Sequence, residues 1–333
     1  MRAIAVRDET QVAEARRAAA NLAKRMGFGE EDAGRVAIVA TELATNVIKH
    51  GSGGELLVGA YDDRSGTGIE CLALDKGPGM ADVQASLRDG HSTAGSAGTG
   101  LGAVVRGSHV LDIYSRPGSG TAILARLRQG RPSRSGPSPE PVSGAVNVPK
   151  AGEDASGDKW CVRAHATGFK LMVADGLGHG PAAAEAAHAA ARVFLAERAS
   201  APAEILNRMH LALRPTRGAA VAVADVDTAA GNVAFAGVGN IAGVLVADGA
   251  ARRMVSHNGT VGHVARRVQE FAYPFKGPPL VVLCSDGLGT GWSLDAYPGL
   301  AHRHPALVAG VLYRDFNRGR DDVTVLVARG DAP

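Results

Sequence analysis

A stretch that cannot build a packed core divides the chain and limits what it can fold into. Residues 130–144, GRPSRSGPSPEPVSG, are mostly Gly, Pro and Ser and show no apolar periodicity. A segment of this composition is typical of a linker. The chain of 333 residues is also long for a single hydrophobic core. We therefore predict two domains, at residues 1–128 and 144–330, joined by a linker at residues 129–143.

Composition and charge exclude several classes of protein. A hydrophobic content of 45% with 21% charged residues is that of a globular protein. The net charge is only +3, and no dense Lys/Arg cluster carries interleaved aromatics, so nucleic acid is not a favoured partner. Cys71, Cys161 and Cys284 each lie in an apolar run, and their odd number argues against a disulfide framework. Neither a signal peptide nor an apolar run of about 20 residues is present, so we expect a cytoplasmic protein without membrane contact.

The first part of the chain alternates helix and strand signals. Helices are expected at residues 11–27, with Thr10 as the cap, and through TELATNVIKHG at 41–51. Strand-like runs follow at 55–63 and 68–77, and residues 110–127 read as two strands joined by a Pro-Gly-Ser-Gly turn. Residues 98–110 read as a Gly-rich turn that opens a helix. This order predicts an α+β layer with helices on one side of an antiparallel sheet.

The second part has more strands than helices. Strand-like runs occupy residues 159–166, 169–175, 219–227, 233–239, 241–248, 279–286 and 323–329. Two helical stretches, at 181–199 and 202–213, interrupt them. Many short strands with few helices predict a sandwich of two sheets flanked by helices.

The stretch TELATNVIKHG places three polar residues beside an apolar stripe. Glu42, Asn46 and His50 follow one another at four-residue spacing, so on a helix they share one face. A carboxylate, a carboxamide and an imidazole beside the core could bind a ligand. His50 leaves two interpretations open, a functional group or a packing histidine at a helix end where the macrodipole favours it.

Two further segments complete the parts that a nucleotide site needs. In DKGPGM, Asp75 stands at a strand end and can accept a hydrogen bond from a base amine, while Gly77 and Gly79 let the backbone approach the ring. A Gly-rich turn at a helix N-terminus offers N–H groups to phosphate, and this turn is formed by Gly98, Thr99, Gly100, Leu101 and Gly102. Each signal is weak by itself, but together and in this order they predict an ATP site. Asn46 could then contact Mg²⁺, and Glu42 could take a proton from a group attacking the γ-phosphate.

These segments resemble the motifs of the GHKL ATPase superfamily. ELATNVIKH is similar to its N-box, DKGPGM to its G1 box and GTGLG to its G2 box. No helix pair with a phospho-acceptor His lies upstream, which favours the compact serine kinase and anti-sigma-factor branch with its RsbT-like switch kinases. There GLGAV, a basic residue such as Arg106, and DIYSRPGSGT occur in similar form. The resemblance implies a GHKL (Bergerat) α/β sandwich that binds ATP, with Mg²⁺ on Asn46, Glu42 as general base and Asp75 on adenine.

Aspartates stand at the ends of strand-like runs in the second part, namely Asp158, Asp175, Asp286, Asp321 and Asp322. Acidic residues at the ends of apolar strands are costly unless they are hydrated, paired or bound to cations. Carboxylates without His or Cys neighbours favour Mg²⁺ or Mn²⁺ over zinc. A single Asp-Gly pair usually marks a turn, but ADGLGHG and SDGLGT echo each other. The pattern predicts a two-cation centre that can act on phosphate.

This part resembles the bacterial form of the metal-dependent protein phosphatases, the SpoIIE and RsbX-like branch. The resemblance implies an αββα sandwich with two Mn²⁺ or Mg²⁺ ions bridged by Asp175, the catalytic aspartate. The other implied contacts come from the Gly176 carbonyl, from Asp286 and Asp321 on one ion, and from Asp158 partly through water.

Three points stay open in that resemblance. Asp322 stands beside a ligand and outside the implied set. His179 either contacts metal-bound water or substrate, or stabilises its turn. No flap with a phosphate-binding Arg precedes Asp158, so the sequence assigns no residue to the substrate phosphate.

The two resemblances together imply a bifunctional regulator. The first domain would phosphorylate, and the second dephosphorylate, Ser or Thr on STAS-domain partners in a bacterial stress-response pathway that controls a sigma factor or a signalling enzyme. In the alternative, the chain is a phosphatase whose GHKL domain only binds a nucleotide, a STAS protein or a sigma factor, without phosphotransfer.

Overall fold

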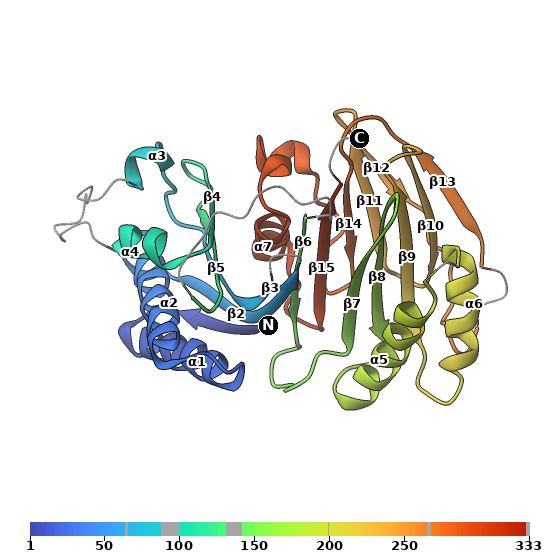
Figure 1. Ribbon diagram of the computed structural model, residues 1–333, viewed down its shortest axis with the longest axis horizontal. Coiled ribbons are helices and arrows are strands. Elements are labelled where there is room, and N and C mark those ends of the chain that lie inside the picture. Colours follow the sequence, from blue (N-terminus) through green and yellow to red (C-terminus); the bar gives the residue numbers. More distant parts are fainter. Residues whose placement is uncertain (64–65, 88–99, 131–141, 199, 265–267, 331–333) are drawn as a thin grey trace. The chain divides into compact units, whose positions relative to one another are not determined.

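The chain forms two compact units, Met1–Ser138 and Pro139–Pro333. The structure is a computed structural model that describes residues 1–333 except 64–65, 88–99, 131–141, 199, 265–267 and 331–333 (Figure 1). The predicted linker falls largely on residues 131–141, outside this description. No helix in the described ranges is long and apolar enough to cross a membrane.

The first unit is one antiparallel sheet with helices on one face (Figure 1). Its elements are β1 (Arg2–Val6), α1 (Glu9–Arg25), α2 (Glu30–Gly51), β2 (Gly54–Asp63), β3 (Gly66–Asp75), α3 (Val83–Ser86), α4 (Gly100–Gly107), β4 (Val110–Ser115) and β5 (Thr121–Leu127). The strand order is β1-β2-β3-β5-β4, and every pairing is antiparallel. The layer expected from the sequence is therefore confirmed, with β1 as an additional edge strand.

The first helix begins earlier than its predicted cap. Asp8 is the N-cap of α1, and its side chain accepts hydrogen bonds from the amides of Thr10 and Gln11. The Gln11 side chain in turn accepts from the Asp8 amide, which completes a capping box. Thr10 lies inside the first turn, so the expected Thr10 cap is wrong. An ionised Asp at this position also interacts favourably with the helix dipole.

The core of the first unit lies between the sheet and the helices. Val36, Leu43 and Val47 on α2 are buried, as the apolar stripe of its sequence predicts. They join residues of the sheet, among them Val58, Cys71 and Ile123, in one cluster. This packing fixes the rotation of α2 and turns its polar ladder toward the edge of the core.

The second unit has two sheets with helices on their outer faces. Its elements are β6 (Val142–Val148), β7 (Asp158–His165), β8 (Gly168–Gly176), α5 (Pro181–Ala196), α6 (Pro202–Ala212), β9 (Ala219–Asp227), β10 (Asn232–Val238), β11 (Ala242–Ala247), β12 (Ala250–Met254), β13 (Glu270–Pro274), β14 (Leu280–Cys284), the short 3₁₀ turns Leu294–Ala296 and Leu300–His302, α7 (Pro305–Phe316) and β15 (Val323–Arg329). The sheet orders are β13-β10-β9-β8-β7 and β12-β11-β14-β15-β6. The strand β6 begins at Val142, inside the segment that the sequence assigns to the linker.

Two apolar clusters hold these layers together. One lies between the sheets and includes Phe169, Leu245 and Leu326. The other joins α5 and α6 to the first sheet and includes Phe194 and Met209. The helix α7 packs against β6 and β15 on the second sheet. The order of layers is helix, sheet, sheet, helix, so the predicted sandwich is confirmed.

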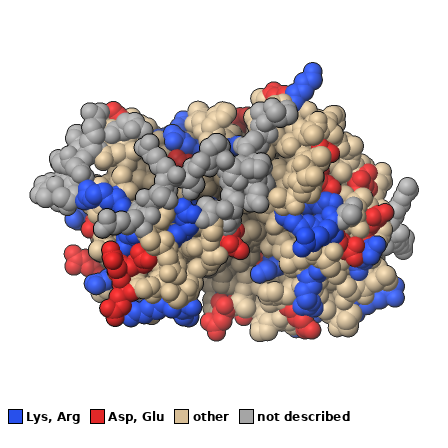
Figure 2. Space-filling model, in the orientation of Figure 1, with Lys and Arg blue, Asp and Glu red and all other residues tan. Residues whose placement is uncertain are grey.

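Surface charge is mixed on both units. Figure 2 shows Lys and Arg side chains interspersed with Asp and Glu on the face that it draws. This agrees with the small net charge of +3.

Candidate functional sites

The polar ladder of α2 faces a cavity of about 870 Å³ in the first unit. Glu42, Asn46 and His50 all line it, and each lies next to the buried stripe of the same helix. The volume is within the range of small-molecule sites, roughly 300–1,000 Å³. The four-residue spacing thus places a carboxylate, a carboxamide and an imidazole along one wall.

The N-terminal turn of α4 approaches the same wall. Gly100 and Leu101 line the cavity, and a Cβ atom at residue 100 would lie 2.7 Å from Glu42 Oε2. Glycine therefore lets the backbone at the start of α4 come next to the Glu42 carboxylate. Free amides at a helix start favour an anion, so a phosphate chain bound there would lie beside Glu42.

Asp75 lines the same cavity, next to the C-terminal end of α2. Its side chain is only 8% exposed, and Oδ1 accepts hydrogen bonds from the amides of Gly77 (2.9 Å) and Thr121 (3.1 Å). These two bonds fix the carboxylate at the end of β3. A fixed, buried carboxylate can select a ligand group that donates a hydrogen bond, such as the amine of a base.

Glycines shape the loop behind Asp75. Gly79 has a φ of +70°, and a Cβ atom there would lie 2.0 Å from the Arg116 carbonyl oxygen. A side chain at this position is excluded by both the backbone conformation and the space. The loop therefore stays thin where it lines the cavity.

The structure brings most of the predicted nucleotide residues together. The residues that line this one cavity are Glu42, Asn46, Asp75, Gly79, Gly100 and Leu101. Gly77 holds Asp75 from behind, and Gly102 is buried inside α4. Gly98 and Thr99 lie outside the described residues.

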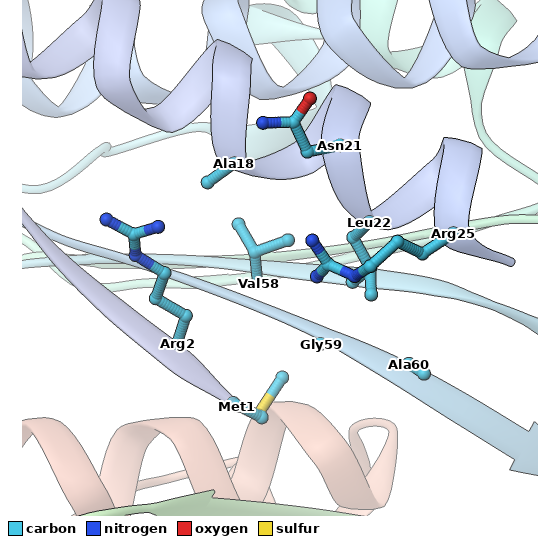
Figure 3. A pocket seen from close by; sticks show the side chains of 9 residues that line it. All are labelled: Met1, Arg2, Ala18, Asn21, Leu22, Arg25, Val58, Gly59 and Ala60. Atoms are coloured by element: carbon cyan, nitrogen blue, oxygen red, sulfur yellow. The ribbon is translucent and has the colours of Figure 1, made fainter. Parts of the chain in front are cut away.

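A smaller cavity of about 280 Å³ lies at the open end of the layer between α1 and the sheet. Arg2 and Arg25 flank Val58 there, with Asn21 above (Figure 3). Arg2 is an exposed partner of Glu14 at 2.6 Å. None of the predicted nucleotide residues lines this cavity, so the larger one is the candidate site.

An acidic centre lies at the strand ends of the second unit. Asp158 on β7 is directly opposite Asp175 on β8 in the strand register. Burial first, and then the negative charges of Asp158, Asp286, Asp321 and Asp322, together raise the pKa of Asp175 to about 9. Aspartates far apart in the sequence thus lie close enough in the fold for their charges to influence one another.

Asp158 is a deeply buried acid of this centre. It is 3% exposed, and Oδ2 accepts a 2.6 Å hydrogen bond from Ser285 Oγ, while Oδ1 is buried without a protein partner among the described residues. Burial raises the pKa of Asp158, and hydrogen bonds of Ser285 and Thr324 lower it in part. The resulting pKa is about 7. A buried carboxylate oxygen with no donor is what a cation or an ordered water would satisfy.

Asp322 has a different task from its neighbour. It is 3% exposed, and its two oxygens accept the amides of Lys150 (2.8 Å) and Gly157 (2.9 Å). Both oxygens therefore bind backbone. Asp321 is exposed, and its Oδ1 accepts the Asp322 amide at 2.9 Å. Asp322 therefore supports the surrounding backbone, whereas Asp321 faces solvent.

Each unit of the chain matches a known protein family. Residues 5–127 match the family described as histidine kinase-like ATPase domain, and residues 165–331 match the family described as stage II sporulation protein E (SpoIIE). The chain belongs to both of these families. Its first unit is the ATPase domain and its second unit the SpoIIE domain.

Individual relatives agree with this division. The ATPase domain is 34% identical over 122 residues to the serine/threonine-protein kinase RsbT of Bacillus subtilis (strain 168), a match that covers 37% of this chain and 92% of that kinase. A solved structure described as "The bacterial stressosome: a modular system that has been adapted to control secondary messenger signaling" covers 57% of this chain and 100% of its own, at 28% identity and a TM-score of 0.54. RsbX in complex with magnesium covers 57% of this chain and 94% of its own, at 17% identity and a TM-score of 0.49. The predicted pairing of an RsbT-like unit with a SpoIIE unit is confirmed by the two family matches and the RsbT relative.

The donor chemistry of the SpoIIE domain fits divalent cations. All the predicted side-chain donors are oxygens, several carboxylates raise one another's pKa values, and Asp158 Oδ1 is an orphaned buried acceptor. Among the described residues, no three His, Cys, Asp or Glu side chains are gathered closely enough to form a metal cage by themselves. Mg²⁺ keeps several waters and needs few protein ligands, so a loose arrangement of acids suits it.

The SpoIIE domain also contains site residues that the sequence analysis missed. Asn240 Nδ2 donates a 2.6 Å hydrogen bond to Asp286 Oδ2, and Ser285 holds Asp158. Ser285 directly follows the apolar strand β14, and Asn240 stands two residues after the end of β10, so a polar residue at a strand end was the signal in the sequence. His179 Nδ1 contacts Glu153 Oε1 at 2.6 Å, which ties the loop after β8 to residue 153 and supports the turn-stabilising interpretation.

Proposed function

We propose that this protein sets the phosphorylation state of Ser or Thr on a STAS-domain partner, with the ATPase domain adding phosphate and the SpoIIE domain removing it. The observation that carries this proposal is the position of Glu42 beside the start of α4, because it pairs a base with a phosphate site. The same chain holds an acidic centre of the kind that acts on phosphate esters.

In the kinase reaction each residue of the cavity has a part. Asp75 would accept the adenine amine, and the amides at the start of α4 would hold the phosphate chain. Asn46 would hold Mg²⁺, which when bound would offset the negative charge of the phosphates. Glu42 would accept the proton of the attacking Ser or Thr hydroxyl.

In the phosphatase reaction the chain's carboxylates create the site. Asp158, Asp175, the Gly176 carbonyl, Asp286 and Asp321 would hold two Mn²⁺ or Mg²⁺ ions. When bound, such ions offset the carboxylate charge, polarise the phosphoryl group and lower the pKa of water. Ser285 and Asn240 fix the orientations of Asp158 and Asp286, and Asp322 fixes the backbone around them.

The relatives support the proposed class of partner. The match to RsbT and the likeness to a structure from a study of the bacterial stressosome support a partner-switching system. In such a system a STAS-domain protein is phosphorylated and dephosphorylated in turn, and a sigma factor or signalling enzyme responds. The proposal places the protein in the bacterial cytoplasm.

The test uses the full chain and its Asp175→Asn variant. Each is mixed with a candidate STAS-domain protein and Mg²⁺-ATP, and phosphate on the partner is followed by mass spectrometry. Phosphorylated partner should accumulate with Asp175→Asn and stay low with the natural chain. In the background of Asp175→Asn, Glu42→Gln should abolish accumulation while ATP still binds in a calorimeter.

The same experiment separates the alternative function. If no variant phosphorylates the partner while the natural chain dephosphorylates a phosphopartner, the ATPase domain is a nucleotide-dependent binding module. If no variant phosphorylates the partner and the natural chain removes no phosphate from a phosphopartner, the proposal is wrong for both domains.

A further inference from the structure

The loop between α6 and β9 brings an arginine to the edge of the acidic centre. Asp175 on β8 is paired with Ala220 on β9. The register continues beyond the strand ends, because the Leu177 amide donates a 3.0 Å hydrogen bond to the Gly218 carbonyl. Arg217 is the next residue, so it lies beside the loop that follows Asp175.

The guanidinium of Arg217 lies against that loop. Its Nη1 is 3.2 Å from the position that a Cβ atom at Gly178 would take. Gly178 has a φ of +88°, so both the conformation and the space favour glycine there. The arginine side chain therefore lies over the backbone three residues after Asp175.

The loop that carries Arg217 is held on both sides. Thr216 Oγ1 donates to the Leu213 carbonyl (2.7 Å) and accepts from the Gly218 amide (3.0 Å). His263 Nε2 contacts the Thr216 carbonyl at 3.0 Å. These contacts fix the backbone immediately before and after Arg217, so the point from which its side chain extends is built into the fold.

Arg217 has no counterion in the described part of the chain. It is exposed, and among those residues it makes no hydrogen bond or ion pair. Two other exposed arginines of this domain do have partners, since Arg208 pairs with Glu197 at 2.8 Å and Arg253 donates to the Thr290 carbonyl at 2.6 Å. An unpartnered guanidinium beside a phosphate-processing centre offers five donors in a fork that matches phosphate oxygens.

We propose that Arg217 binds the phosphoryl group of the phosphoserine or phosphothreonine substrate in the SpoIIE domain. The inference rests on the proposed phosphatase function for the nature of the substrate. It fills the phosphate contact that the sequence leaves unassigned. Arg217 is a substrate-binding residue, because its donors would contact the phosphoryl oxygens and orient the group toward Asp175.

Two measurements on the full, Mn²⁺-loaded chain test the inference. One is calorimetric binding of inorganic phosphate, and the other is turnover of a small aryl phosphate and of a phosphopartner. The variants are Arg217→Ala, Arg217→Lys, and the matched control Arg214→Ala, which removes a charge from the same exposed loop. Circular dichroism melting checks that each variant folds.

Loss of a charge-assisted contact made before and during the reaction should raise KM more than it lowers kcat. We expect Arg217→Ala to weaken phosphate binding and to raise KM by about ten- to a hundredfold, the size of a hydrogen bond to a charged group. Arg217→Lys should recover part of the loss, and Arg214→Ala should match the natural chain.

The inference is overturned if Arg217→Ala binds phosphate like the natural chain, or if only its kcat falls. Failure of the proposed function is a separate outcome. If the natural chain turns over no phosphate ester, phosphate binding alone decides the role of Arg217.

Discussion

At the residue scale, two neighbouring aspartates show how one sequence pair divides its work. Asp322 accepts two backbone amides with its two oxygens, whereas Asp321 is exposed to solvent. Asp322→Asn replaces one acceptor by an NH₂ group and leaves a buried amide without a partner, which should cost about 1–3 kcal/mol of unfolding free energy. Urea denaturation of the SpoIIE domain measures this.

The matched change is Asp321→Asn. It keeps the oxygen that accepts the Asp322 amide, so stability should change by less than about 0.5 kcal/mol. Phosphatase activity should nevertheless fall steeply, because the proposed function makes Asp321 a cation ligand. Equal stability losses in the two variants would contradict this division.

Asp175 makes the stability of the SpoIIE domain depend on pH when no cation is present. Its pKa rises from 3.8 in the unfolded chain to about 9 in the folded one, so folding favours the protonated form. Above the unfolded value the unfolded chain loses this proton and the folded chain keeps it. The unfolding free energy in EDTA should therefore fall between a pH of about 4 and about 9.

Asp175→Asn is the matched control because the new side chain cannot ionise. Its unfolding free energy should therefore fall less over that pH range. Thermal unfolding at several pH values with EDTA provides the measurement. A melting temperature that rises through the range in the natural chain, and not in Asp175→Asn, would contradict the assignment.

At the element scale, the proposed kinase function makes Gly100 the residue of α4 where phosphate binding would meet catalysis. A Cβ atom at Gly100 would lie 2.7 Å from Glu42 Oε2, and the flexible carboxylate can move away. Gly100→Ala should therefore leave ATP binding nearly intact while it slows phosphotransfer by about ten- to a hundredfold, as expected for a displaced catalytic group. The exposed Val105→Ala on the same helix is the control.

The readout for Gly100→Ala is ATP affinity by calorimetry beside the rate of partner phosphorylation. Loss of both together would place Gly100 in nucleotide binding alone. An unchanged rate would show that Glu42 is not the base.

The sequence predicts an element well when one face of that element packs on the core and the other face lies in solvent. The polar ladder on α2 and the strand ends with Asp75 and Asp175 follow from periodicity and turn chemistry alone. The short β1, β12 and β13 were missed because edge strands have few consecutive apolar residues. The helix α7 was missed for the opposite reason, since its buried residues run without a break from Pro305 to Tyr313 and show no helical period.

Side-chain partners were harder to predict than elements. Ser285, Asn240 and Arg217 reach the acidic centre through register and loop geometry, which a sequence pattern does not specify. The sequence predicts Thr10 instead of Asp8 as the cap of α1 because Asp and Thr are both good capping residues. The capping box with the Gln11 side chain distinguishes them in the structure.

At the scale of the whole molecule, each unit has its own core, so we expect two unfolding transitions. ATP added to the Mg²⁺-containing chain should raise only the transition of the ATPase domain. Mn²⁺ without nucleotide should raise only that of the SpoIIE domain. At about a hundred times the dissociation constant, each shift should be about 5–10 °C.

Differential scanning calorimetry of the full chain makes this measurement. Asp175→Asn should lose the Mn²⁺ shift and keep the ATP shift. One cooperative transition that both ligands move together would show that the units unfold as one.

The two backbone hydrogen bonds that Asp322 accepts affect the order in which the two units of a newly made chain can be completed. The ATPase domain is complete at β5, which ends at Leu127, whereas the acidic centre needs Asp322 and the strand that follows it to Arg329. Ribosomes add about 5–20 residues per second, so on the order of 10–40 seconds separate the two events. A nascent chain can therefore fold the ATPase domain, with its candidate nucleotide site, well before it can assemble the acidic centre, and a chain that terminates early never acquires that centre.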